Sequence, residues 1–313
     1  MVWSYLFGIT IAHGIFLMVL MVLKRAKRTL GTWLIAGVIL VAVITNADFF
    51  LLASGLYQSV PKVFGMSFGM LLLLGPLYFL YAKTMTDPGF TWRWVYALHF
   101  VPYLFHLVLN VPLYVMDTQA KIAFVDTLLS GRLAFRPADV LFNIVQIVIT
   151  VVYFAVAMIE ISKAKTLLED VPYVVPVDER IHWLNTLLVF FMSYVACIII
   201  LLVYLVVKGR FIPGANYIYT LASSAILYML GFRLILNPEL VNPDFLKKYQ
   251  NAKHVSDEDQ ARYLAKLYDL TDNEKLFLDP ALKLTDVAAG LASLHTSSLN
   301  SSMSGAANPS RSL

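Results

Sequence analysis

Residues 183–207 read WLNTLLVFFMSYVACIIILLVYLVV and contain no charged side chain. A helix that crosses the hydrocarbon core of a bilayer needs about 20 mostly apolar residues, and this stretch is long enough. In lipid the backbone groups have no water to bind, and a helix satisfies them within one segment. The stretch therefore predicts a membrane-spanning helix.

Six further stretches share this character: 2–23, 31–54, 63–84, 93–115, 138–161 and 213–236. Over the whole chain, 59% of the 313 residues are hydrophobic and 14% are charged, whereas soluble domains average about 45–50% and about 25%. The first charged residue, Lys24, follows the first stretch, which favours an uncleaved span over a signal peptide. We therefore predict an all-α protein. A seven-helix transmembrane bundle over residues 1–236 is followed by a short, incomplete helical cytoplasmic domain.

Positive charge in the connections predicts the orientation of the bundle. Nine Lys and Arg residues lie beside one set of span ends, among them the cluster Lys24, Arg25, Lys27 and Arg28, and six lie beside the other set. Because Lys and Arg concentrate in cytoplasmic loops, we expect the N-terminus outside and the C-terminus in the cytoplasm. The formal net charge of +4 arises in the membrane part, where Lys and Arg outnumber Asp and Glu by 16 to 10, so it requires no nucleic-acid partner.

Polar residues inside the predicted spans are the candidates for a site, because such residues are costly in hydrocarbon. Asp48 is expected near the outer end of its span. His106 and Asn110 are expected near the outer end of theirs, on one helix face with His99. This placement predicts an outward-opening polar pocket. One interpretation is a ligand or proton sensor, since histidine titrates near neutral pH; the other is a set of hydrogen bonds that joins the helices.

Several chemistries have no residues to support them. Cys197 is the only cysteine, which excludes an intramolecular disulfide and a cysteine-based metal site. The sequence has no HExxH, GxSxG or Walker-type phosphate loop. The last span has no lysine that could form a retinal Schiff base. We expect no catalytic residue, no metal, no cofactor and no enzymatic activity.

The chain changes character after the last span. Residues 237–256 are a polar linker, and residues 257–291 carry a helical apolar stripe followed by a short segment that Thr285 can cap. Residues 292–313 are rich in Ser, Ala, Gly and Pro, a composition that predicts disorder. The alternative is an amphipathic tail lying on the membrane, which its acidic residues disfavour.

Residues 274–291, EKLFLDPALKLTDVAAGL, resemble the opening of an AraC-type helix-turn-helix domain. The membrane part resembles the seven-transmembrane module that precedes such domains in some bacterial regulators, at residues 73–81, 98–104, 231–233 and 237–240. The resemblance implies a transcriptional regulator of the bacterial inner (cytoplasmic) membrane. It would respond to an unknown small-molecule or membrane signal and pair as a homodimer on DNA. Thr285, Ala288 and Leu291 would be the remnant of its DNA-binding element.

Residues 292–304, ASLHTSSLNSSMS, depart from the family where its recognition helix should follow. With permitted codons, the same bases in another frame encode ISTHQLSQQLNE, which resembles the family's next element. We therefore hypothesise a frame shift near Leu291 and expect that the chain as written does not bind DNA specifically. The alternative is a seven-helix membrane receptor or transporter-like protein with a short interaction tail and no role at DNA.

Overall fold

The structure is a computed structural model that describes residues 2–23, 29–87, 89–132, 136–169, 175–212 and 214–236, together with 264, 265 and 268. The chain divides into two compact units, residues 1–247 and 248–313. Of the second unit, only Leu264, Ala265 and Tyr268 are described, and they are helical and exposed. The predicted linker, the rest of the helix-turn-helix remnant and residues 292–313 lie outside the described residues.

Over the described residues, the first unit contains helices and no strand, which confirms the all-α prediction. The α-helices are α1 (Val2–Leu23), α2 (Leu30–Ser54), α3 (Leu71–Thr86), α4 (Val101–Leu109), α5 (Val111–Tyr114), α6 (Thr118–Leu129), α7 (Pro137–Glu169), α8 (Val175–Lys208) and α9 (Tyr217–Leu236). The 3-10 helices are η1 (Leu56–Gln58), η2 (Pro61–Val63) and η3 (Trp94–Phe100).

Five of the described helices, α1, α2, α7, α8 and α9, are long and apolar enough to cross a membrane. Two further apolar helices are shorter, Leu71–Thr86 and Trp94–Leu109. The long helices expose apolar side chains such as Val189, Ile200 and Val207, as contact with lipid requires. The structure thus supports a multi-pass membrane protein, with five of the seven predicted spans at full membrane length.

The predicted span 63–84 was wrong at its start. Residues 64–70 form a turn, and α3 begins only at Leu71. In this turn Gly65 has a φ of 85° and Gly69 a φ of 77°, a left-handed conformation that glycine adopts without steric cost. The stretch is apolar enough to be taken for helix, but its backbone does not follow a helix.

The predicted span 93–115 divides into η3, α4 and α5. Pro102 lies in the first turn of α4 and Pro112 in the first turn of α5. Proline has no amide hydrogen, so it is tolerated in a first helical turn and disrupts a helix interior. Pro102 therefore marks the start of a helix, whereas Pro76 lies inside α3.

Helix α3 packs against both α2 and α7 and supplies two fully buried tyrosines to the main hydrophobic core. The Tyr78 hydroxyl donates to the carbonyl oxygen of Leu184 at 2.7 Å, and Trp183 Nε1 donates to the Tyr81 hydroxyl at 2.9 Å. Both bonds attach α3 to α8. In lipid such polar contacts add to side-chain packing in holding helices together.

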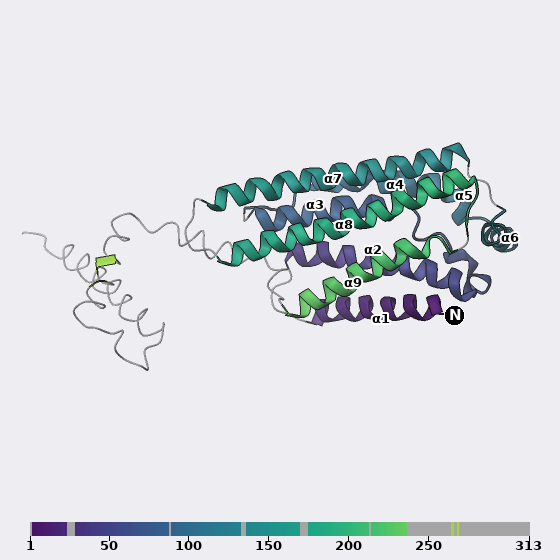
Figure 1. The fold of residues 1–313 in the computed structure, drawn as a ribbon, viewed down its shortest axis with the longest axis horizontal. Coiled ribbons are helices and arrows are strands. Elements are labelled where there is room, and N and C mark those ends of the chain that lie inside the picture. Colours follow the sequence, from purple (N-terminus) through teal and green to yellow (C-terminus); the bar gives the residue numbers. More distant parts are fainter. Residues whose placement is uncertain are drawn as a thin grey trace, which may run out of the picture. The chain divides into compact units, whose positions relative to one another are not determined.

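One end of the bundle carries a cap, which we define as η1, η2, the turn 64–70, α5 and α6. Figure 1 shows α5 and α6 at the end of the bundle where α1 and α7 begin. Tyr57, Phe64 and Val125 form a small hydrophobic core of its own within the cap. The cap thus rests on the same end of the bundle to which Asp48, in the last turns of α2, belongs.

Candidate functional site

Asp48, in the last turns of α2, holds the turn 64–70 by hydrogen bonds. Its side chain is 2% exposed, and its carboxylate accepts hydrogen bonds from the Gly65 amide at 3.1 Å, the Ser67 amide at 3.3 Å and the Ser67 hydroxyl at 2.5 Å. Three hydrogen bonds from the turn thus converge on one side chain. One buried carboxylate therefore fixes the connection between α2 and α3.

Lys121 brings a buried positive charge into the cap from α6. Its side chain is 0% exposed, and Nζ donates to the carbonyl oxygen of Lys62 at 3.2 Å. Burial lowers the pKa of Lys121, and the negative charge of Asp48 opposes this shift. Lys121 is one of the six positive charges that the sequence places beside the outer span ends, and it was not predicted to be buried. Its spacing from Val125, one helical turn away on the same buried face, was the signal that could have identified it.

His106 contacts the same turn from α4. Its ring is buried and lies so close to Gly69 that a Cβ on that glycine would be 2.1 Å from His106 Cδ2. The ring also interacts with the backbone of Phe68 and stacks on Phe142 of α7, with ring centroids 4.7 Å apart. Gly69 is thus required both by its backbone conformation and by the space that the imidazole occupies.

Asn110 and His99 were predicted to share the site with His106. Asn110 Nδ2 lies 3.1 Å from His106 Nδ1 and donates to the His106 carbonyl oxygen at 2.9 Å, so this pair is close as expected. His99 lies elsewhere, on η3, with Nδ1 2.8 Å from the Tyr153 hydroxyl and its ring 5.6 Å from that of Phe79. The two histidines lie on one continuous helical segment, Trp94–Leu109, but they contact different parts of the bundle: His99 contacts Tyr153 and Phe79, whereas His106 contacts Gly69 and Phe142.

The structure thus brings Asp48 and His106 to one turn, whereas they were predicted to line one pocket. Asp48 binds residues 65 and 67, and His106 contacts residues 68 and 69. The polar groups are therefore occupied with the protein backbone. Elsewhere polar residues join helices directly: Asn46 of α2 bonds to Ser223 at 3.0 Å and to Ser224 at 2.9 Å, both on α9.

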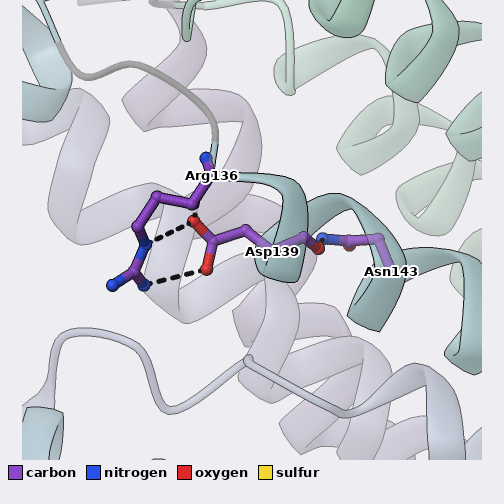
Figure 2. Close-up of polar contacts among 3 residues, drawn as sticks. All are labelled: Arg136, Asp139 and Asn143. Carbon is purple, nitrogen blue, oxygen red and sulfur yellow. Dashed lines mark hydrogen bonds and ion pairs between the residues drawn. The ribbon is translucent and has the colours of Figure 1, made fainter.

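The start of α7 positions Phe142 behind His106. Figure 2 shows Arg136 and Asp139 in a two-pronged ion pair, with Nε and Nη2 each 2.9 Å from a carboxylate oxygen. Asp139 also accepts from the Arg136 amide at 3.3 Å, which satisfies one free amide at the helix start. Asn143 continues the helix, its Nδ2 donating to the Asp139 carbonyl at 2.8 Å. An exposed ion pair contributes little stability, so we assign this group to helix initiation.

No group of three or more His, Cys, Asp or Glu side chains able to hold a metal ion occurs among the residues that the structure describes. The proposed DNA-binding remnant, Thr285, Ala288 and Leu291, lies outside those residues. No protein-family model, no curated protein and no solved structure matches the chain.

Proposed function

We propose that the chain is a membrane-bound sensor of the bacterial inner membrane that crosses the bilayer seven times. Its N-terminus lies outside, its cap faces outward and its tail lies in the cytoplasm. Its organisation resembles that of membrane-anchored AraC-type transcriptional regulators. The sensing element is the turn 64–70 with the side chains that hold it.

The observation that supports this proposal most is that buried titratable groups from two helices, Asp48 and His106, hold one short turn. The turn connects α2 to α3, and α3 packs against α2 and α7 in the main core. A signal that weakens either attachment therefore frees a connection between two core helices. A ligand shifts such an equilibrium only as far as it binds the two states differently.

The output is proposed to reside in the tail. A shift in the bundle would pass through the polar linker 237–256 and alter the pairing or DNA binding of the cytoplasmic domain, in a homodimer that meets two half-sites. With its recognition helix replaced by residues 292–304, the chain as written is proposed to bind DNA without sequence specificity or not at all. The tail carries 8 Lys and Arg against 10 Asp and Glu, which provides little attraction to phosphate.

A fusion experiment tests the sensor function apart from the tail's own DNA binding. A reporter domain whose DNA binding requires dimerisation is attached after Leu313, and transcription of its target gene is measured in bacteria. We expect Asp48→Asn to change the output several-fold, because it releases the turn. Asp117→Asn, at an exposed aspartate that caps the start of α6, should leave the output unchanged. Equal output from all three chains at equal membrane levels would refute the sensor.

Two further measurements test the tail. A band-shift assay with residues 237–313 is expected to show no salt-sensitive, sequence-specific complex. Sequencing the gene from the codon for Pro280 onward is expected to show an open alternate frame with helix-turn-helix patterning. Without such a frame, the chain is better described as a membrane receptor or transporter-like protein with a short interaction tail.

A further inference from the structure

A cavity of about 330 Å³ lies between α3, α4 and α7. Its lining is apolar apart from one side chain, and it includes Leu72, Phe105, Leu109, Leu141, Phe142 and Gln146. Phe105 is 61% exposed and Leu141 is 62% exposed, so the mouth of the cavity opens on the apolar outer surface of the bundle. A ligand would therefore enter from the membrane and not from water.

Gln146 is the one polar side chain in this lining. It is only 7% exposed, and over the described residues its side-chain amide makes no hydrogen bond. An amide that faces an apolar cavity without a hydrogen-bond partner is unfavourable by about 1–3 kcal/mol. A water molecule would not relieve this, because stable buried water needs two to four polar partners and the other lining side chains are apolar.

The volume limits the size of the occupant. Small-molecule pockets commonly measure about 300–1,000 Å³, so this cavity is at the lower end and suits a single chain better than a whole two-chain phospholipid. No charged side chain lines it, which favours a neutral head group. The Gln146 amide can both donate and accept, and a carbonyl-bearing head group such as an amide or ester matches it.

We infer that this cavity binds a neutral single-chain amphiphile from the membrane, with its chain along Phe105 and Leu141 and its carbonyl on Gln146. Phe142 forms one wall of the cavity and its other neighbour is His106, with ring centroids 4.7 Å apart. A ligand in the cavity would therefore contact Phe142 and, through it, affect the position of the His106 ring that packs against Gly69. The inference names the ligand class for the proposed sensor and rests on that function only for this last step.

Binding is tested directly, without any transcriptional readout, on the full chain in phosphatidylcholine nanodiscs. The probe is N-methyl decanamide with a diazirine in its chain, and the labelled peptides are identified by mass spectrometry. We expect saturable labelling of α4 and α7. Gln146→Leu should raise the half-saturating concentration about three- to tenfold, as expected for one lost hydrogen bond. Asn143→Leu, which removes an amide outside the cavity, should leave it unchanged.

A second pair of variants tests the space itself. Ala138→Phe places a ring at an exposed lining position and should abolish saturable labelling, whereas Val148→Phe, exposed on the same helix but outside the lining, should not. Equal labelling of the Gln146→Leu and Asn143→Leu variants would overturn the proposed head-group contact. Labelling of the same peptides by a diazirine-bearing phosphatidylcholine that the amide cannot displace would assign the cavity to bilayer lipid. Either result leaves the role of Asp48 and the turn to be judged by the reporter fusion.

Discussion

Asp48 and His106 hold the same seven-residue turn from two different helices. The Asp48 carboxylate accepts hydrogen bonds from the amides of Gly65 and Ser67 and from the Ser67 hydroxyl. The His106 ring lies against Gly69. The turn therefore depends on hydrogen bonds to a buried carboxyl group on one side and on close packing on the other. The two attachments differ in chemistry, so they can be broken separately.

Replacing Asp48 by Asn should destabilise the fold by about 1.5–3 kcal/mol, the usual contribution of hydrogen bonds to a charged group. The amide loses the negative charge that buried Lys121 experiences, and it offers one acceptor oxygen in place of two. Thermal unfolding in nanodiscs measures the loss. The matched control is Asp117→Asn, since Asp117 also accepts two backbone amides, from Gln119 and Ala120, but is exposed. Equal losses in the two variants would contradict the role of burial.

Adding Lys121→Met to Asp48→Asn extends this test. Once the negative charge is gone, the buried ammonium has lost its opposite charge, and removing it should restore part of the stability. The two changes should therefore be less than additive. Strict additivity would show that the charges of Asp48 and Lys121 do not influence each other in the folded chain.

Replacing Gly69 by Ala should be among the most harmful changes in the cap. The left-handed backbone costs an alanine about 1–2 kcal/mol, and the new methyl group would displace the stacked His106 ring at a further cost of about 1–3 kcal/mol. Gly55→Ala is the control, because Gly55 has a φ of 78° and nothing within 4 Å of the added carbon. Unfolding measurements should show a larger loss of stability in Gly69→Ala than in Gly55→Ala. When His106→Ala is added to Gly69→Ala, it should restore only this difference, because the backbone strain at residue 69 remains.

At alkaline pH the cap should also lose the part of its stability that the Tyr57 hydroxyl contributes. Burial raises the pKa of Tyr57, and its hydrogen bond to Asp126, 2.7 Å long, raises it further. The folded state therefore holds this proton more tightly than the unfolded state. Its stabilising effect is complete below about pH 10, the ordinary tyrosine value, and is lost as pH rises through the raised pKa.

Comparison of the wild-type chain with Tyr57→Phe measures this contribution. The wild type should be the more stable below pH 10, and the difference in unfolding free energy should shrink toward zero above it. A difference that stays constant across this range would mean that the Tyr57 proton is not held more tightly in the folded cap.

The sequence predicted the helices more successfully than it predicted how they are joined. Apolar length is a local property, so the α7, α8 and α9 regions could be identified directly. The turn 64–70 was missed because its residues are as apolar as a span, and only the backbone conformation of Gly65 and Gly69 distinguishes it. Asp48 and His106 were found because polar residues are rare in such stretches. Their meeting at one turn could not be predicted, because it depends on that unpredicted backbone.

The number of membrane crossings rests on α3 and on the shorter helix Trp94–Leu109, and the position of Thr91 decides it. If both helices cross the membrane, the exposed residue Thr91 between them lies in the cytoplasm. If they enter from the cap side and turn back without crossing, Thr91 stays on the cap side. Single cysteines at Ser59, Thr91 and Gln119, in a Cys197→Ala background, are labelled in intact cells with a membrane-impermeant maleimide. We expect Ser59 and Gln119 to react from outside and Thr91 to react only after lysis. Thr91 reacting with the other two would reduce the crossings to five, which the long helices alone would provide, and labelling of only Thr91 would invert the proposed orientation.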